Sequence, residues 1–199
     1  RTEMDNAGML SSNWPTDPSG AGYMMAEVHY YPYQYSLMTA DENWGKQFYY
    51  YSGLESTTDA AHNMGAATNA GVLGTPAQIS KAFGELKTMF CDKGIPVIIG
   101  ELGAIKRTGQ ITGDNLKLHL QGRALFYGEV AKNAIDYILS HEADFKEASV
   151  IWDFIGGEPF LEIDLIDKIC DYLKTEMFRL NHHWFNSYRF SFSTNGINY

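Results

Sequence analysis

Cysteine, basic charge and long apolar runs are all scarce in this chain. Only two of its 199 residues are cysteines, and Cys91 and Cys170 each lie among apolar neighbours without metal-ligand spacing. We therefore expect buried free thiols rather than a metal site or a disulfide framework. No window is long and apolar enough to cross a membrane. The chain begins at Arg1 without a recognisable signal peptide, which leaves its location open.

The charge balance is acidic, with 24 Asp and Glu against 15 Lys and Arg and a net charge of -9. Without a basic patch, nucleic acid is a poor partner. No dinucleotide-binding fingerprint opens any predicted helix, so we expect no cofactor of that kind. His119 is expected on the surface of a helix. His182 and His183 are adjacent and could not face one site on a helix, so we expect no metal site.

What the chain does contain is ordinary globular material, 45% hydrophobic and 20% charged, with enough length for one sizeable core. Aromatic residues are abundant, with 13 Tyr, 11 Phe and 4 Trp, and many fall in loops. Such residues stack on sugar rings, but they also build aromatic cores. Residues 33–74 form a long aromatic insertion. Its Trp44 and Tyr49–Tyr51 fit either distal sugar subsites or a loop that packs on itself.

Strands and helices alternate along the predicted chain. Strands are expected over residues 23–31, 95–99 and 148–154, and helices over 75–94, 114–138 and 165–180. This order is typical of an α/β protein in which helices cross over between parallel strands.

Each predicted strand ends in residues that can do chemistry or stack on a ligand. These are His29 and Tyr31 at the end of the first strand, Glu101 at the end of the second, and Trp152 with Asp153 at the end of the third. In α/β barrels the reactive groups lie at the C-terminal ends of the strands. The glycines that flank Glu101 let other groups approach its carboxylate. The plainer alternatives are a structural ion pair for Glu101 and a core position for His29.

Three motifs carry a resemblance to a known family. They are Val28-His29-Tyr30-Tyr31, the run from Gly94 to Ala104 that contains Glu101, and Ile151-Trp152-Asp153. Together they resemble the sixth, seventh and eighth strands of glycoside hydrolase family 5, the cellulase-type (β/α)8 barrels. Trp44-Gly45-Lys46 in the insertion resembles the endoglucanase and xyloglucanase branch. The implied fold is a partial TIM barrel, roughly strands six to eight with their helices and without the N-terminal half. Residues 1–160 would be the C-terminal half of that barrel, and residues 161–199 a final helix and a divergent tail.

The resemblance implies a retaining hydrolase that cleaves internal β-1,4 bonds of glucans. Glu101 would be the nucleophile, Tyr31 would hydrogen-bond and orient it, His29 would bind the sugar at the scissile bond, and Trp152 would stack beneath that sugar. A β-glucan polysaccharide or oligosaccharide is the implied partner, with no cofactor, no metal, no nucleic acid and no membrane. The family habit and the size of such substrates imply an extracellular, secreted protein.

The family's acid/base motif, Asn-Glu-Pro, is absent. Glu158-Pro159 echoes it but lacks the Asn and follows the wrong strand. A complete barrel has eight strands and about 250 residues, so we expect the missing half in the full-length chain and little activity without it. Mannanase, xyloglucanase and xylanase specificities share these motifs. A non-catalytic carbohydrate-binding remnant is a further alternative, as is an unrelated barrel enzyme such as an aldolase, although no predicted strand ends in Lys.

Overall fold

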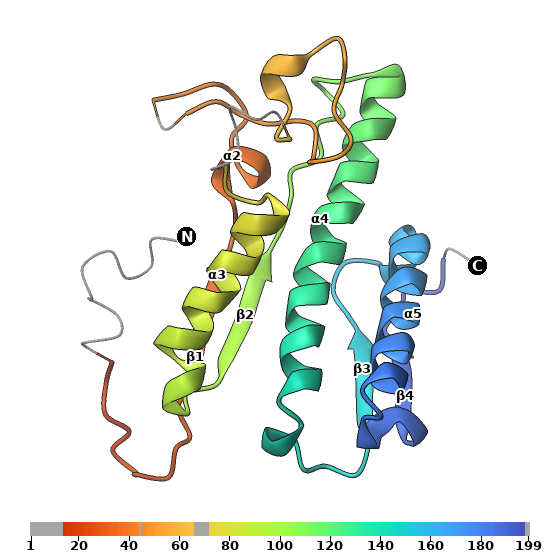
Figure 1. Ribbon diagram of the computed structural model, residues 1–199. Coiled ribbons are helices and arrows are strands. Elements are labelled where there is room, and N and C mark those ends of the chain that lie inside the picture. The colour runs from red at the N-terminus through yellow and green to blue at the C-terminus, as the bar shows by residue number, and fades with distance from the viewer. Residues whose placement is uncertain (1–13, 44, 66–71, 198–199) are drawn as a thin grey trace. The chain divides into compact units, whose positions relative to one another are not determined.

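The structure is a computed structural model that describes residues 14–43, 45–65 and 72–197 (Figure 1). Its strands are β1 (Ala26–Tyr30), β2 (Val97–Leu102), β3 (Val150–Phe154) and β4 (Tyr188–Phe192). Its α-helices are α2 (Tyr33–Ser36), α3 (Pro76–Met89), α4 (Gly113–Ser140) and α5 (Ile163–Arg179). The expected α/β class and the three expected strands are confirmed. No helix in the described part of the chain is long and apolar enough for a membrane span.

Contacts group the chain into two compact units, one up to Tyr127 and one from Gly128 onward, so the division falls within α4. The expected boundary between residues 160 and 161 came from the family resemblance rather than from packing, and it stays a prediction. Each unit is described by itself below.

The first unit holds a parallel pair, β1 and β2, connected through α3. The helix begins where the sequence predicts, because the Thr75 side chain accepts a hydrogen bond from the Gln78 N–H and Pro76 occupies the first turn. The chain leaves the following 3-10 turn through Gly94 in the left-handed region, with φ of 75°. Ala26, Leu86 and Phe90 form the core between strand and helix. Strand, helix and strand therefore make one crossover unit, as expected.

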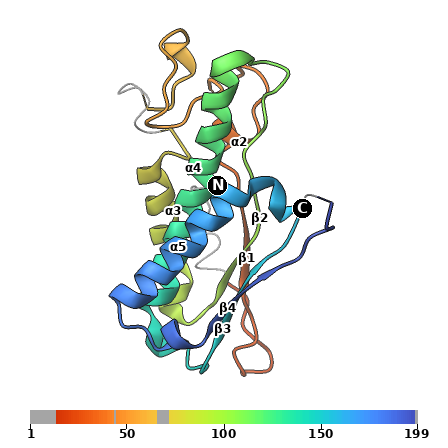
Figure 2. The ribbon, with the colours of Figure 1, turned by 90° about the vertical axis from the view of Figure 1, so that its right-hand side faces the viewer.

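The second unit repeats this arrangement with β3, α5 and β4 (Figure 2). The strands pair in parallel, from Val150 with Tyr188 to Phe154 with Phe192. One face of α5 carries its buried residues, Ile166, Cys170, Leu173 and Met177. Leu173 and Met177 pack against Trp184 of the segment that leads into β4. This fourth strand is absent from the sequence prediction, which treats the region as a divergent tail.

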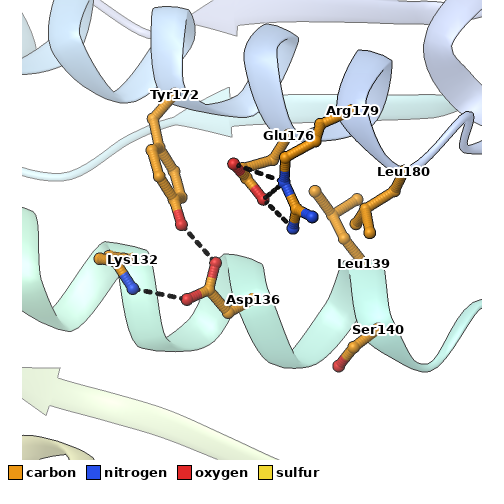
Figure 3. Close-up of a pocket in the computed structure, with 8 residues that line it drawn as sticks. All are labelled: Lys132, Asp136, Leu139, Ser140, Tyr172, Glu176, Arg179 and Leu180. Carbon is orange, nitrogen blue, oxygen red and sulfur yellow. Dashed lines mark hydrogen bonds and ion pairs between the residues drawn. The ribbon is translucent and has the colours of Figure 1, made fainter.

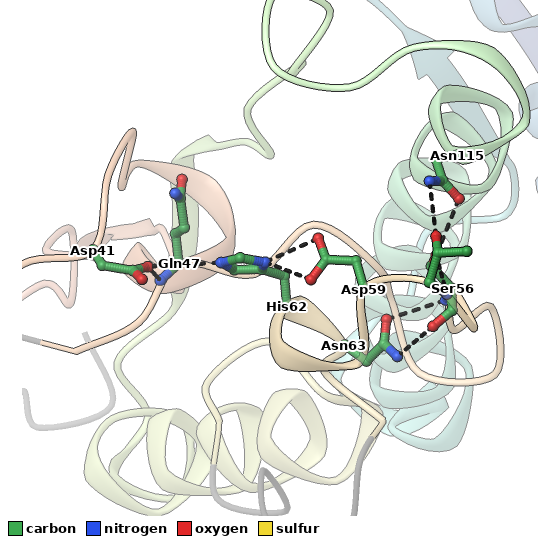
Figure 4. A network of polar contacts seen from close by, with 8 residues as sticks. Asp41, Gln47, Ser56, Asp59, His62, Asn63 and Asn115 are labelled. Atoms are coloured by element: carbon green, nitrogen blue, oxygen red, sulfur yellow. Dashed lines mark hydrogen bonds and ion pairs between the residues drawn. The ribbon is translucent and has the colours of Figure 1, made fainter.

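Two of the three tyrosines at positions 49–51 of the aromatic insertion, residues 33–74, are buried. Tyr50 and Tyr51 are only 1% and 2% exposed, so neither can line a sugar subsite as the chain stands, and Trp44 lies outside the described residues. Tyr49 stacks on His62, which binds Asp59 through Nδ1 at 2.7 Å (Figure 4). Further contacts in Figure 4 join the Asn63 amide to the Ser56 carbonyl and the Ser56 hydroxyl to Asn115 of α4. Tyr50 contacts Tyr49 of the same loop. Tyr51 contacts Tyr35 of the loop but also Phe126 of α4, so packing of the loop on itself describes Tyr51 only in part.

His119 of α4 is fully buried, so the expectation of a surface position is wrong. Its Nε2 accepts the Arg107 backbone N–H at 3.1 Å, and its Nδ1 lies 2.7 Å from the Tyr49 carbonyl. The imidazole therefore joins α4 to the insertion and to the loop that follows β2. Arg107 is itself 1% exposed; its guanidinium lies over the Tyr49 ring and donates to Gln47. Helix periodicity could not reveal this burial, because the partners come from loops.

Candidate active site

The ends of β1 and β2 bring Glu101, His29 and Tyr31 together. Val28 pairs with Ile99, but His29 pairs with Glu101, so the register shifts and Gly100 is the extra residue on β2. Side chains alternate between the faces of a strand, and a regular strand would turn Glu101 to the same side as Ile99. The bulge reverses that alternation and turns Glu101 to the exposed side instead. The expected convergence of these three residues is thus found, and the bulge is its local cause.

A short network of polar contacts holds the Glu101 carboxylate. The Tyr31 hydroxyl donates a hydrogen bond to Glu101 Oε2 over 3.1 Å. His29 Nδ1 lies 3.4 Å from the same oxygen. The side chains of His29 and Glu101 are 52% and 55% exposed, so a ligand could reach both. The hydrogen bond expected from Tyr31 is present; the catalytic roles of the three residues stay predictions.

Two glycines around Glu101 make room for its neighbours, as their sequence positions suggested. A Cβ on Gly100 would lie 2.0 Å from the carboxylate oxygen of Glu27 on β1. A Cβ on Gly103 would lie 3.1 Å from the ring of Tyr31. A side chain at Gly100 would displace Glu27, whose Cδ would lie 2.8 Å away, and one at Gly103 would press on the ring that orients Glu101. Both positions therefore favour glycine.

The electrostatics of Tyr31 favour its role as a donor. Desolvation raises the pKa of its phenol, and the hydrogen bond and negative charge of Glu101 raise that pKa further. The phenol consequently keeps its proton across the pH range in which carboxylates are ionised. A neutral hydroxyl that donates to a carboxylate stabilises the charged form of that carboxylate.

Sequence reasoning missed Glu27 as a member of this cluster. Its Oε1 lies 3.8 Å from His29 Nε2, so His29 stands between two carboxylates, Glu27 and Glu101. The signal was available, because residues two apart on a strand share a face, and Glu27 precedes His29 by two. The site therefore carries a second carboxylate that the motif comparison does not include.

Trp152, the fourth expected site residue, lies on β3 in the second unit. It is partly buried and packs against the core cluster there, with its ring centroid 6.2 Å from that of Trp184 in an edge-on arrangement. The neighbouring Asp153 side chain is on the exposed side of the strand. The platform role expected for Trp152 stays a prediction.

A pocket in the second unit, between α4 and α5, offers no comparable chemistry (Figure 3). Its polar side chains neutralise one another: Asp136 binds both Lys132 and the Tyr172 hydroxyl, and Glu176 binds Arg179. No charge among these residues is left to bind or activate a substrate. We interpret this pocket as a groove between two helices whose lining charges are paired with one another.

The expectation that His182 and His183 cannot share a site assumed a regular helix, and here it is wrong. His182 has an extended backbone, with φ of -66° and ψ of 140°, and a 3-10 turn begins only at His183. The two imidazoles consequently stack, with centroids 4.6 Å apart. Both approach Glu142, which follows the end of α4.

Comparison with known proteins points to the same family as the motifs. No protein-family model matches the chain. The chain is similar to a xyloglucan-specific endo-β-1,4-glucanase of Bacteroides ovatus, with 29% identity over 130 residues, which are 64% of this chain and 21% of that protein. Among solved structures, it is similar to a Bacteroides ovatus family 5 xyloglucanase in complex with a XXXG heptasaccharide, at 27% identity and a TM-score of 0.41 over 56% of this chain and 21% of the other.

The chain thus spans about a fifth of the length of these relatives. The sequence identity supports the predicted relation to glycoside hydrolase family 5. The assignment to strands six to eight of a barrel is a finer statement and stays a prediction.

Proposed function

We propose that this chain is part of a retaining glycoside hydrolase that cleaves internal β-1,4 bonds of a glucan, with Glu101 as its nucleophile. The observation that carries the proposal is the arrangement at the ends of β1 and β2. There Tyr31 donates to Glu101 Oε2 and His29 lies within 3.4 Å of the same oxygen. The similarity to a xyloglucan-specific endoglucanase supports it and makes xyloglucan the first polymer to test.

In the proposed reaction, a Glu101 oxygen attacks the anomeric carbon as the bond to the leaving oxygen breaks, which forms a glycosyl ester. Water then cleaves the ester and frees the carboxylate. Tyr31 keeps the carboxylate ionised and aimed, and His29 binds the sugar beside the scissile bond. Trp152 would serve as a sugar platform, a role that the chemistry at Glu101 does not require.

The leaving oxygen needs a proton from an acid that we place in the missing half of a (β/α)8 barrel, because the Asn-Glu-Pro motif is absent here. General acid catalysis contributes about 10²–10⁴-fold, so the 199-residue chain should cleave xyloglucan or β-glucan slower than a complete enzyme by at least that factor. Since such polymers lie outside cells, the proposal includes secretion of the full-length protein.

The decisive experiment uses a substrate that reacts without a proton donor. A dinitrophenyl β-cellobioside with fluorine beside the anomeric carbon has a leaving group that departs without protonation, and the fluorine slows hydrolysis of the ester. We expect mass spectrometry of the treated chain to find the sugar on Glu101. Glu101→Gln should remain unlabelled, whereas the matched variant Glu27→Gln should keep the label.

Labelling of another carboxylate would overturn the assignment of Glu101. Unlabelled protein that nevertheless binds cello- or xyloglucan oligosaccharides in a titration would favour the non-catalytic carbohydrate-binding alternative instead.

A further inference from the structure

Two imidazoles and a carboxylate meet in the second unit, in a cluster that the proposed hydrolase chemistry does not use. Glu142 follows the end of α4, while His182 and His183 lie between α5 and β4. One ligand atom from each residue lies within 4.8 Å of the others. Such a set of two histidines and one glutamate is a donor set for Zn²⁺.

His183 is oriented as a metal ligand. Its Nε2 lies 3.0 Å from the Glu147 carbonyl, a contact in which that nitrogen must donate its proton. The other nitrogen, Nδ1, therefore faces Glu142 Oε1, 2.5 Å away. If the His183 ring is neutral, its Nδ1 and Glu142 Oε1 are both acceptors. A proton or a metal ion must then lie between these two atoms. A backbone carbonyl that accepts from the other ring nitrogen is a usual partner of a metal-ligating histidine.

His182 supplies the buried side of the cluster. It is only 3% exposed, and its Nε2 is buried without a hydrogen-bond partner among the described residues. Its Nδ1 accepts the Trp184 backbone N–H at 3.2 Å. A buried nitrogen without a partner is unfavourable, and a metal ion at Nε2 would satisfy it. Ligation there requires the tautomer with its proton on Nδ1, which gives up the hydrogen bond from the Trp184 N–H.

The surroundings allow the cluster to close on an ion. Tetrahedral Zn²⁺ with ligand bonds of about 2.0–2.2 Å holds its ligand atoms about 3.5 Å apart. On binding, the Glu142–His183 contact of 2.5 Å must therefore open, and any ligand atoms near the 4.8 Å limit must move closer. Glu142 and His183 are exposed and free to adjust, whereas His182 is held in the core. Solvent reaches the cluster from the exposed side, which leaves room for a water as the fourth ligand.

We propose that Glu142, His182 and His183 bind a divalent transition metal of the Zn²⁺ class. The ion joins two segments 40 residues apart in sequence, the end of α4 and the start of the turn that leads into β4. The ion would tie β4 to the rest of the unit, and its fourth position would be open to a water.

Calorimetric titration of the full chain with Zn²⁺ tests this proposal, in a Cys91→Ser background that removes the more accessible thiol. We expect binding of one ion and a rise in Tm. Glu142→Gln and His183→Gln should each weaken binding by at least about tenfold. His182→Asn should do the same, since Asn keeps an oxygen to cap the Trp184 N–H but lacks Nε2. The control His141→Gln, which changes the histidine next to Glu142, should bind as the parent does.

Imidazole ¹⁵N NMR provides a readout on the parent protein that does not depend on any variant folding. Zn²⁺ should shift the resonances of His182 Nε2 and His183 Nδ1 and leave those of His62 in place. Absence of these shifts, or equal affinity in the parent and both exposed-ligand variants, would overturn the site.

Discussion

At the residue scale, the position of Glu101 depends on one extra residue in a strand. The shift between Val28 and His29 makes Gly100 a bulge, and the carboxylate consequently turns toward His29 and Tyr31. The motif in the sequence indicates which residues meet, because each lies at the end of a predicted strand. It cannot indicate the bulge, which is a property of the pairing between two strands far apart in the chain.

Tyr31→Phe tests the hydrogen bond to Glu101 directly. The variant keeps the ring beside Gly103 but removes the proton donor to the carboxylate. We therefore expect labelling of Glu101 by the fluorinated glycoside to slow by about tenfold. Tyr23→Phe, at a tyrosine that is 85% exposed, is the matched control and should label at the parental rate. A Tyr31→Phe variant as fast as the parent would mean that the hydroxyl does not assist Glu101.

At the element scale, the sequence predicts helices and strands well where local rules decide them. Thr75, Pro76 and Gly94 delimit α3 and its exit as capping chemistry requires. The missed strand β4 shows the opposite case. Tyr188–Phe192 alternates aromatic and polar residues, a strand signal by itself, but the resembled family has no matching pattern there. Its pairing with β3 and the packing of Trp184 are tertiary facts that no local window contains.

His119 ties α4 to two loops, and its burial predicts that the stability of the protein depends on pH. Burial lowers the pKa of its imidazole, so the folded protein keeps it neutral while the unfolded chain takes up a proton below about pH 6.5. Stability should therefore decline as pH falls from about 6.5 toward the lowered pKa, and should not change through this group above pH 6.5. Urea unfolding between pH 8 and 5 measures that decline.

His119→Gln should remove this part of the pH dependence. At pH 8 it should also destabilise the protein by about 1–3 kcal/mol, because both polar atoms of Gln lie at the tip of its side chain, whereas His119 meets the Arg107 N–H and the Tyr49 carbonyl with nitrogens on different sides of its ring. His141→Gln, at a half-buried histidine just beyond α4, should leave the slope unchanged. An unaltered slope in His119→Gln would show that another group governs the acid sensitivity.

At the scale of the whole molecule, family resemblance supplies what local patterns cannot. Alternating strands and helices indicate a parallel α/β fold, and the pairs β1–β2 and β3–β4 agree. The number of strands in a complete barrel comes only from the resemblance. The matched segment is about a fifth of the length of these relatives.

An incomplete barrel has a physical consequence that can be measured. The faces of β2 and β3 that a closed barrel would cover carry exposed aliphatic residues, Ile98 at 47% and Ile151 at 54%. Apolar sheet faces and unpaired strand edges favour association with other chains. We therefore expect the isolated chain to self-associate with increasing concentration in sedimentation velocity experiments. Ile98→Ser and Ile151→Ser together should shift this association to higher concentration.

Ile155→Ser is the control for that experiment, because Ile155 is 67% exposed but lies in the turn after β3 rather than on a strand. If general surface hydrophobicity drove association, Ile155→Ser would weaken self-association as much as either strand substitution does. If the sheet faces drive it, the control should have little effect, because a turn residue covers neither the sheet face nor a strand edge. A parent chain that stays monomeric and melts in one sharp transition would instead show that its strands need no further partner, which would contradict the partial-barrel interpretation.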